Sequence, residues 1–338
     1  MNQINPVNPV RLSLPSKGRL ADGSLDFLAA CGLQVNKTNP RQYEARIPGL
    51  SELVVLFQRP GDIVVSVRDG SVDFGITGLD VTEEWSGENG DVIVLHDALG
   101  FGHCTLNLAV PEAWEDVRTV ADLSRMRLEP ERPLRVATKF PNLTGRFLQA
   151  HEVRYTLISA EGTLETAPAI GYADLIADLV SSGQTLRDNR LRPLEDGTIL
   201  ASQAALIANR RSLETNPRSL AIARHLLEYF DAHLRAAENL AIFANMRGSS
   251  PEAIAARLFE QPAIGGLQGP TISRVIVRDG DPNWYAVHIV VRRDRLFQAV
   301  GELRAVGGSG VVVAPVNYIF EEEPPRYKAM LEALNLER

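Results

Sequence analysis

The sequence predicts an α/β protein with two lobes, followed by a smaller α+β domain. Short apolar strands alternate with helical patterns through the first part of the chain, which is typical of a largely parallel sheet. The chain changes character near residues 100–104, where a second series of strands begins. A third group of strands follows a long amphipathic helix, so we assign it to a separate domain.

The first lobe begins with a short apolar strand at residues 11–14. This strand runs into the polar turn 15–19 and then into a helical pattern. Two more strands are expected at 53–58 and 74–77, with a helical segment at 60–68 between them. This alternation of strand and helix predicts a parallel arrangement.

The second lobe is expected to contain strands at 106–110, 134–138 and 154–159. Residues 174–181 are compatible with a strand or a helix that leads into a Ser/Gly turn, and residues 199–208 with a return strand. We therefore expect two α/β lobes of similar size with a cleft between them.

The last domain follows an amphipathic helix at 218–235. Strands are expected at 271–277 and 286–291, then a helix at 296–306 and a further strand at 310–316. A β-β-α-β unit of this length indicates a small α+β module of the ferredoxin-like kind.

The expected boundaries follow from these changes along the chain. A polar turn is expected at 279–282, and the acidic and proline-rich residues 321–325 are expected to join the last strand to a short terminal helix. The predicted parts are a loose N-terminal arm at 1–10, lobe I at 11–105 and 200–236, lobe II at 106–199, and the C-terminal domain at 237–338.

Composition narrows the class of protein. The 338 residues carry a net charge of −7, which argues against a nucleic-acid surface. There are only two cysteines, Cys31 and Cys104, and neither they nor the six histidines show the spacing of a metal site. No secretory signal or membrane-spanning run is found, so we expect a cytoplasmic protein with no membrane partner.

The segment that follows Asp178 has the chemistry of a phosphate site. Gly183 can adopt a positive φ, and small residues allow backbone N–H groups to converge on an anion, to which Ser182 and Thr185 add hydroxyl donors. Asp178 would repel a phosphate, so it is better placed to accept hydrogen bonds from the hydroxyls of a ribose. The pattern favours a sugar-phosphate site, although a bare SSGQT segment is also compatible with an ordinary turn.

The loop is part of a longer pattern of spaced residues. Its members are Glu165, Gly171, Ala173, Ile176, Asp178, Ser182, Gly183, Thr185 and Leu186. This pattern resembles the signature of ATP phosphoribosyltransferase, the first enzyme of histidine biosynthesis. Residues 15–20, 59–63, 73–80 and 137–144 also resemble segments of that family. The arm, residues 112–133 and the tail after Ile319 do not match.

The resemblance implies a two-lobed, periplasmic-binding-protein-like catalytic part with a C-terminal ferredoxin-like regulatory domain. It implies transfer of the phosphoribosyl group of phosphoribosyl pyrophosphate to N1 of ATP, giving phosphoribosyl-ATP and pyrophosphate. Mg²⁺ is the expected cofactor, held mainly through substrate phosphates. The protein must position two polyanions around an oxocarbenium-like transition state, and it need not supply a nucleophile.

The sugar site is expected to hold the 5-phosphate at residues 181–185 and the ribose at Asp178. Glu165 and Asp174 are further carboxylates near this site, and one of them is expected to hold Mg²⁺ or a ribose hydroxyl, or else to have a structural role. The residues expected to bind phosphoribosyl pyrophosphate are Glu165, Asp174, Asp178, Ser181, Ser182, Gly183, Gln184, Thr185 and Leu186.

A second set of residues is expected to bind ATP or pyrophosphate. Lys17 and Arg19 follow a strand at the mouth of the expected cleft, and a guanidinium such as that of Arg59 binds phosphate in bidentate fashion. Taken singly, each of these cations is also compatible with an ordinary surface charge. The expected ATP or pyrophosphate residues are Lys17, Gly18, Arg19, Arg59 and Asp73. The expected catalytic residues are Asp178, Lys17 and Arg19, and further candidates are Asp80, Lys139 and Thr144.

The C-terminal domain resembles the one that distinguishes the long form of the family. Residues 269–273 and 307–310 carry this resemblance. It implies feedback inhibition by histidine, with Thr271, Ser273 and Ser309 near the ligand, and a homo-oligomer that exchanges between dimer and hexamer.

Two other functions fit part of the sequence. Two α/β lobes around a cleft also describe solute-binding proteins, which catalyse nothing. A phosphoribosyltransferase with another acceptor would keep the same loop, and only the resemblance around Lys17 and Asp73 favours ATP.

Overall fold

The computed structural model describes residues 9–37, 39, 43–126, 132–159, 162–277 and 283–336. Most of the predicted arm and the whole of the predicted turn at 279–282 lie outside these residues. The chain forms two compact units. One contains the residues up to His225 and those from Arg326 onward, and the other contains Leu226–Pro325.

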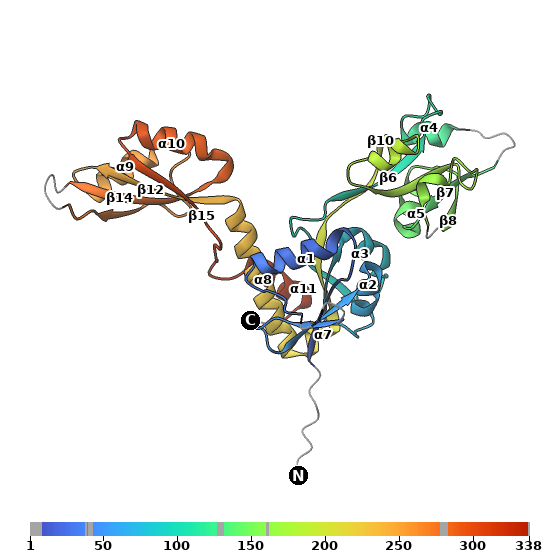
Figure 1. Ribbon diagram of the computed structural model, residues 1–338, viewed down its shortest axis with the longest axis horizontal. Coiled ribbons are helices and arrows are strands. Elements are labelled where there is room, and N and C mark those ends of the chain that lie inside the picture. Colours follow the sequence, from blue (N-terminus) through green and yellow to red (C-terminus); the bar gives the residue numbers. More distant parts are fainter. Residues whose placement is uncertain are drawn as a thin grey trace, which may run out of the picture. The chain divides into compact units, whose positions relative to one another are not determined.

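The first unit contains a six-stranded sheet and a five-stranded sheet, which correspond to the two predicted lobes (Figure 1). The six-stranded sheet has a parallel centre, β3-β1-β4, extended by antiparallel strands at both sides. Across this sheet the strands are β2 (Glu44–Arg46), β3 (Leu53–Gln58), β1 (Val10–Pro15), β4 (Phe74–Gly78), β11 (Ala204–Asn209) and β5 (Val92–His96). Its helices are α1 (Arg19–Ala30), α2 (Pro60–Arg68), α3 (Leu79–Trp85) and α7 (Arg210–Thr215).

The parallel centre of this sheet sets the position of three turns. Apolar residues of β1 are buried, as expected for a central strand covered on both faces. Because β3, β1 and β4 run in the same direction, their carboxyl ends meet at one edge. The turns before α1, α2 and α3 therefore lie at this edge.

In the five-stranded sheet β9, β7 and β8 pair in parallel, and β6 pairs antiparallel with both β9 and β10. In order they are β10 (Leu191–Ser202), β6 (Cys104–Pro111), β9 (Leu175–Val180), β7 (Leu134–Thr138) and β8 (Tyr155–Ser159). The helices here are α4 (Val120–Arg125), α5 (Pro141–Ala150), the 3-10 turn η1 (Leu164–Thr166) and α6 (Gln184–Asp188). The segment for which strand and helix were both open is thus the strand β9.

The chain crosses between the two sheets twice. It passes from β5 to β6 through residues 97–103, and it returns from β10 to β11 at Gln203. The single return strand predicted at 199–208 is therefore wrong. Its first residues pair with β6 in one sheet and its last residues pair with β4 in the other, because the chain changes sheets in the middle of the apolar run.

The second unit is a ferredoxin-like β-α-β-β-α-β domain. Its antiparallel sheet has the order β13-β14-β12-β15, and α9 and α10 pack on one face over a shared apolar core (Figure 1). The predicted β-β-α-β pattern lacked the first strand and helix. The elements are α8 (Pro217–Ala237), β12 (Asn239–Arg247), α9 (Pro251–Phe259), β13 (Thr271–Arg274), β14 (Trp284–Arg292), the 3-10 turn η2 (Arg293–Arg295), α10 (Leu296–Ala305) and β15 (Ser309–Pro315).

Helix α8 leads from the first unit into the second. The terminal helix α11 (Pro325–Leu334) was expected within the domain at 237–338, but the residues from Arg326 group with the first unit. Arg326 pairs there with Asp97 at 2.9 Å, and Arg224 lies over the ring of Tyr327. These contacts explain why the end of the chain belongs with the first unit.

Candidate active site

The loop between β9 and α6 is the segment expected to bind the 5-phosphate. Gly183 has φ of +70°, so it adopts the left-handed conformation that glycine allows, and α6 starts directly after it. Arg187 donates hydrogen bonds to the carbonyl oxygen of Ser182 at 3.2 Å and to the side-chain oxygen of Gln184 at 3.0 Å. These bonds hold the loop in a tight curl.

This loop encloses a small cavity of about 150 Å³. Its lining contains two of the three carboxylates of the predicted sugar site, Glu165 from η1 and Asp178 from β9. The remaining lining residues are Leu179, Val180, Ser181, Ser182, Gly183, Thr185 and Leu186. The structure thus brings most of the predicted set together around one cavity.

Asp178 is a partly buried carboxylate in this cavity. One of its oxygens accepts a hydrogen bond from the N–H of Leu179 at 2.8 Å. Burial raises the pKa of Asp178, and the negative charge of Glu165 raises it further, although the Leu179 N–H and the charge of Lys139 act in the opposite direction. A desolvated carboxylate of this kind gains free energy when hydroxyl groups donate hydrogen bonds to it.

Asp174 does not belong to the cavity. It precedes β9, whereas the phosphate loop follows the other end of that strand. Six residues of strand separate the two ends by about 20 Å. Its carboxylate accepts hydrogen bonds from the guanidinium of Arg132 at 2.5 and 2.8 Å, and from Arg135 through its backbone N–H at 2.8 Å and its side chain at 3.0 Å. Asp174 therefore has a structural role, the second of the two roles expected for it.

The structure does not place Gln184 in the cavity lining. Its side-chain amide donates to Asp188 at 2.6 Å and its side-chain oxygen accepts from Arg187, so the side chain lies along α6. Its backbone N–H remains part of the loop and points to Ser182 Oγ at 3.4 Å.

The predicted cations lie at the carboxyl edge of the other sheet. Lys17, Gly18 and Arg19 follow β1, and Arg59 follows β3. The three basic side chains are exposed. Gly18 has φ of +84°, and nothing would lie within 4 Å of a Cβ there, so the backbone of this turn is open to a ligand.

Asp73 lies at the opposite edge of that sheet. It precedes β4, and its carboxylate accepts hydrogen bonds from the N–H of Arg11 at 2.8 Å and from the hydroxyls of Ser212 and Ser219. These contacts join β1, α7 and α8. The structure therefore does not bring Asp73 together with Lys17, and it gives Asp73 a structural role.

The further candidates differ in position. Asp80 follows β4 at the same edge as Arg19 and lies 4.0 Å from that side chain. Lys139 follows β7 and is exposed, and its charge reaches Asp178. Thr144 is buried, with its hydroxyl 3.2 Å from that of Thr138, so it supports the turn before α5.

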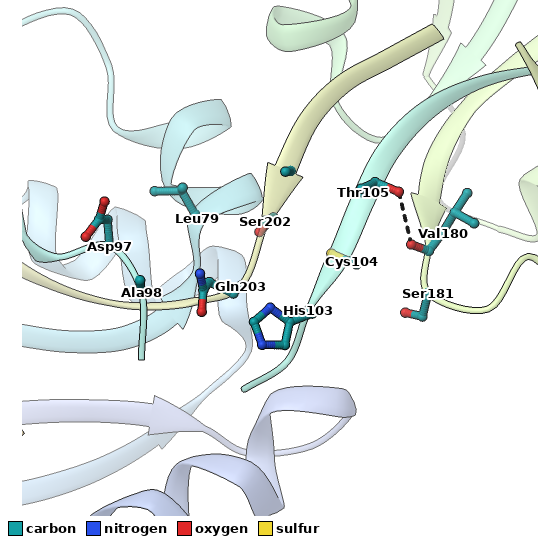
Figure 2. Close-up of a pocket in the computed structure, with 11 residues that line it drawn as sticks. Leu79, Asp97, Ala98, His103, Cys104, Thr105, Val180, Ser181, Ser202 and Gln203 are labelled. Atoms are coloured by element: carbon teal, nitrogen blue, oxygen red, sulfur yellow. Dashed lines mark hydrogen bonds between the residues drawn. The ribbon is translucent and has the colours of Figure 1, made fainter. Parts of the chain in front are cut away.

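A larger cavity of about 510 Å³ lies where the chain crosses between the sheets (Figure 2). It shares Val180 and Ser181 with the loop cavity. Sequence reasoning missed most of its lining, and the only signal was the change of character at residues 100–104. The lining residues are Leu79, Asp97, Ala98, His103, Cys104, Thr105, Val180, Ser181, Ala201, Ser202 and Gln203.

The three residues expected to bind histidine lie on opposite edges of the C-terminal sheet. Thr271 and Ser273 belong to β13, and Ser309 belongs to β15, where its hydroxyl donates to the carbonyl oxygen of Asn245 at 3.2 Å. The two edge strands are separated by two others, which corresponds to about 14 Å. One copy of the chain therefore does not bring all three residues together.

No helix in the described ranges has the length and apolar character needed to cross a membrane. In the same ranges, no three His, Cys, Asp or Glu side chains gather into a group suited to hold a metal ion.

Comparison with known proteins agrees with this geometry. Residues 59–231 match the model of a family described as ATP phosphoribosyltransferase, and residues 236–318 match the model of the HisG C-terminal domain. An Arabidopsis thaliana protein named ATP phosphoribosyltransferase 2, chloroplastic, is 48% identical over 97% of this chain and 81% of its own length. The ATP phosphoribosyltransferase of Bradyrhizobium sp. (strain ORS 278) is 34% identical over 96% of this chain and 98% of its own.

A solved structure has a related fold. It is described as the ATP phosphoribosyl transferase (HisG:HisZ) complex from Thermotoga maritima. The match has a TM-score of 0.51 and 25% sequence identity, and it covers 66% of this chain and 98% of the other.

Proposed function

The chain belongs to the ATP phosphoribosyltransferase family, in the long form with a C-terminal domain, and from this premise we propose which residues carry the reaction. The enzyme is a pentosyltransferase of histidine biosynthesis. It transfers the phosphoribosyl group of phosphoribosyl pyrophosphate to N1 of ATP and releases pyrophosphate. The assignments below concern the residues, the metal and the regulation.

The loop cavity holds the phosphoribosyl group. Backbone N–H groups and hydroxyls of Ser181–Thr185 bind the 5-phosphate, since a curled loop with a left-handed glycine presents several donors to one anion. Asp178 accepts hydrogen bonds from the ribose hydroxyls. Its negative charge also lies close to the sugar carbon that becomes positive as pyrophosphate leaves, which lowers the barrier electrostatically.

The departing pyrophosphate and the triphosphate of ATP require cations. Lys17, Arg19 and Arg59 supply these from the carboxyl edge of the six-stranded sheet. The open backbone at Gly18 allows a phosphate to approach the start of α1. The acceptor base occupies the larger cavity, which shares Ser181 with the loop cavity and so places the ring nitrogen beside the sugar.

Mg²⁺ fits the carboxylates of the loop cavity. Magnesium is commonly held by one or two carboxylates together with substrate phosphates, and Glu165 and Asp178 line the same cavity closely enough for one charge to shift the pKa of the other. These two residues are therefore the ones that would hold it. When bound, the ion would neutralise part of the negative charge of the substrate phosphates.

Regulation by histidine is assigned to the C-terminal domain. Because Thr271 and Ser273 lie on the edge opposite Ser309, a ligand that contacts both sets requires a second copy of the chain. Binding of histidine would then be coupled to association of copies, in a dimer or hexamer. The test is to measure turnover and molecular mass together as histidine is added. A rate and a mass that both ignore histidine would contradict this assignment.

The reducing cytoplasm remains the proposed location. Cys31 and Cys104 are both free and buried, and neither contributes a disulfide. Fractionation of cells that express the full chain would test this assignment.

The proposed sugar site depends most on Asp178, so we test the proposal by substituting this residue. We expect Asp178→Asn to reduce pyrophosphate release in the presence of both substrates by about a hundredfold. The matched control is Asp174→Asn, at the other end of the same strand, which should keep turnover near that of the wild type. Equal losses in the two variants would show that the loop cavity is not the sugar site.

A further inference from the structure

Asp80 lies at the centre of a buried polar cluster beside the larger cavity, whose lining includes its neighbours Ser202 and Cys104. Its side chain is only 3% exposed. One carboxylate oxygen accepts a hydrogen bond from Ser202 Oγ at 2.7 Å, and the backbone N–H of Asp80 donates to the same hydroxyl at 2.9 Å. The other oxygen lies 4.0 Å from Nη2 of Arg19. The carboxylate thus has a fixed orientation and faces one cation.

The carboxylate of Asp80 occupies the space that a side chain at position 78 would need. A Cβ atom at Gly78 would lie 2.0 Å from the Oδ1 atom of Asp80, which is far inside van der Waals contact. Gly78 has φ of −75°, a value that other residues adopt equally well, so the backbone conformation does not require a glycine here. The glycine is explained by the carboxylate that occupies its side-chain space.

Arg19 is held by a second contact from the crossover between β5 and β6. Its guanidinium donates to the carbonyl oxygen of Gly102. That crossover packs closely on α1, since a Cβ at Gly102 would lie 2.2 Å from Leu20 and the rings of Phe27 and Phe101 are 5.5 Å apart. The Arg19 side chain still remains 32% exposed, so part of it can reach a ligand.

Asp80 therefore connects Arg19 to both crossovers. Ser202 ends β10 at the return crossover, and Gly102 belongs to the outward one. The thiol of Cys104, the first residue of β6, lies in the same cluster: burial raises its pKa, the charge of Asp80 raises it further, and Arg19 lowers it. The cluster joins the end of β4, the start of α1 and the two segments that link the sheets.

We propose that Asp80 is a positioning residue, which holds the Arg19 guanidinium in the orientation that binds the polyphosphate. The inference rests on the proposed role of Arg19. A guanidinium that is oriented before the substrate arrives loses less conformational freedom on binding. The long separation of 4.0 Å leaves the guanidinium free to form its shorter contacts with phosphate oxygens.

A double-mutant cycle tests this inference. Asp80→Asn keeps the size of the side chain and an acceptor for Ser202, but it removes the charge that faces Arg19. We expect about a tenfold loss in kcat/KM, mostly through a higher KM for the substrate whose phosphates Arg19 binds. In the Arg19→Ala background the same change should cost less than about twofold, because Asp80 then has nothing left to position.

The control is Glu83→Gln, an exposed carboxylate on the same helix, which should leave turnover unchanged. If Asp80→Asn does not fold, Gly78→Ala displaces the carboxylate without removing it and should show the same dependence on Arg19.

Three outcomes overturn the inference. Additive losses in the double variant would show that Asp80 acts on the fold and not through Arg19. An Arg19→Ala variant with normal kinetics would remove the premise on which the inference rests. A wild-type chain that releases no pyrophosphate would instead refute the proposed residue assignment before Asp80 is tested.

Discussion

Replacing Glu84 with alanine should weaken the contact between the two lobes of the first unit. Glu84 belongs to α3, yet its carboxylate accepts hydrogen bonds from the first turn of α5, at 2.8 Å from the N–H of Asn142 and at 2.9 Å from that of Leu143. Residue Phe140 precedes α5 and has no side-chain oxygen to cap it. The cap of this helix is therefore supplied by the other lobe.

The size of the effect follows from the burial of these groups. Glu84 is 3% exposed, and Leu143 is buried while Asn142 is exposed. A buried N–H that loses its acceptor costs about 1–3 kcal/mol, and an exposed one recovers part of this from water. Adding the loss of a carboxylate at a helix N-terminus, we expect Glu84→Ala to lower the free energy of unfolding of the first unit by about 3 kcal/mol.

Urea unfolding followed by tryptophan fluorescence is a suitable assay, because Trp85 directly follows the substituted residue. Glu83→Ala is the matched control on the exposed face of α3, and it should change the free energy of unfolding by less than about 0.5 kcal/mol. If Glu84→Ala stays within that range, or if Glu83→Ala costs as much, the inter-lobe cap does not stabilise the unit.

Three more predictions concern the second lobe. Burial alone would raise the pKa of Asp174, but hydrogen bonds from Arg132 and Arg135 outweigh it and hold the pKa below its ordinary value of 3.8. Asp174→Asn should therefore lower the free energy of unfolding by about 2 kcal/mol at neutral pH. In urea titrations the difference between wild type and variant should disappear as the pH falls below 3.8, because Asp174 then becomes protonated. A difference that persists in acid would contradict the ion-pair explanation. The pKa of Asp178 is raised, so this carboxylate takes up a proton at a higher pH than an ordinary aspartate does. Calorimetry should therefore show that binding of phosphoribosyl pyrophosphate weakens as the pH is lowered and Asp178 becomes protonated. The Asp178→Asn variant should show a smaller dependence of binding on pH. Gly183→Ala should weaken the same binding by about tenfold, since the position has φ of +70° and the new Cβ would lie 3.1 Å from Arg187, whereas Gly49→Ala, with nothing within 4 Å, should bind normally.

The grouping of residues around the loop cavity was predictable because most of them are close together in the sequence. Asp178, the loop and Gly183 form one strand–turn–helix segment, so spacing alone defines their relative positions.

Two of the predicted site residues lie away from the cavities because of the direction of their strands. Asp73 and Asp174 each precede a strand, whereas Asp80 and Ser181 follow one. Ligands of α/β sheets lie beyond the carboxyl ends of the strands, so this difference in order was a signal that could have separated the two pairs.

The larger cavity was not predictable, because it exists only after the chain has crossed between the sheets twice. Its lining comes from five separate segments, at residues 79, 97–98, 103–105, 180–181 and 201–203. The crossover at Gln203 interrupts an apolar run in which periodicity gives no sign of a change of sheet. Such a site depends on tertiary contacts, in contrast to the loop.

Identification of the product is the measurement that tests the central claim most directly. The wild-type chain would be incubated with Mg²⁺, ATP and phosphoribosyl pyrophosphate, and the nucleotide product would be analysed by mass spectrometry and NMR. We predict a single adduct with the ribose on N1 of the adenine, formed in amounts equal to the pyrophosphate released and about a hundredfold more slowly with Asp178→Asn. Pyrophosphate release with ATP recovered unchanged, or an adduct that Asp178→Asn still forms at the wild-type rate, would contradict the account.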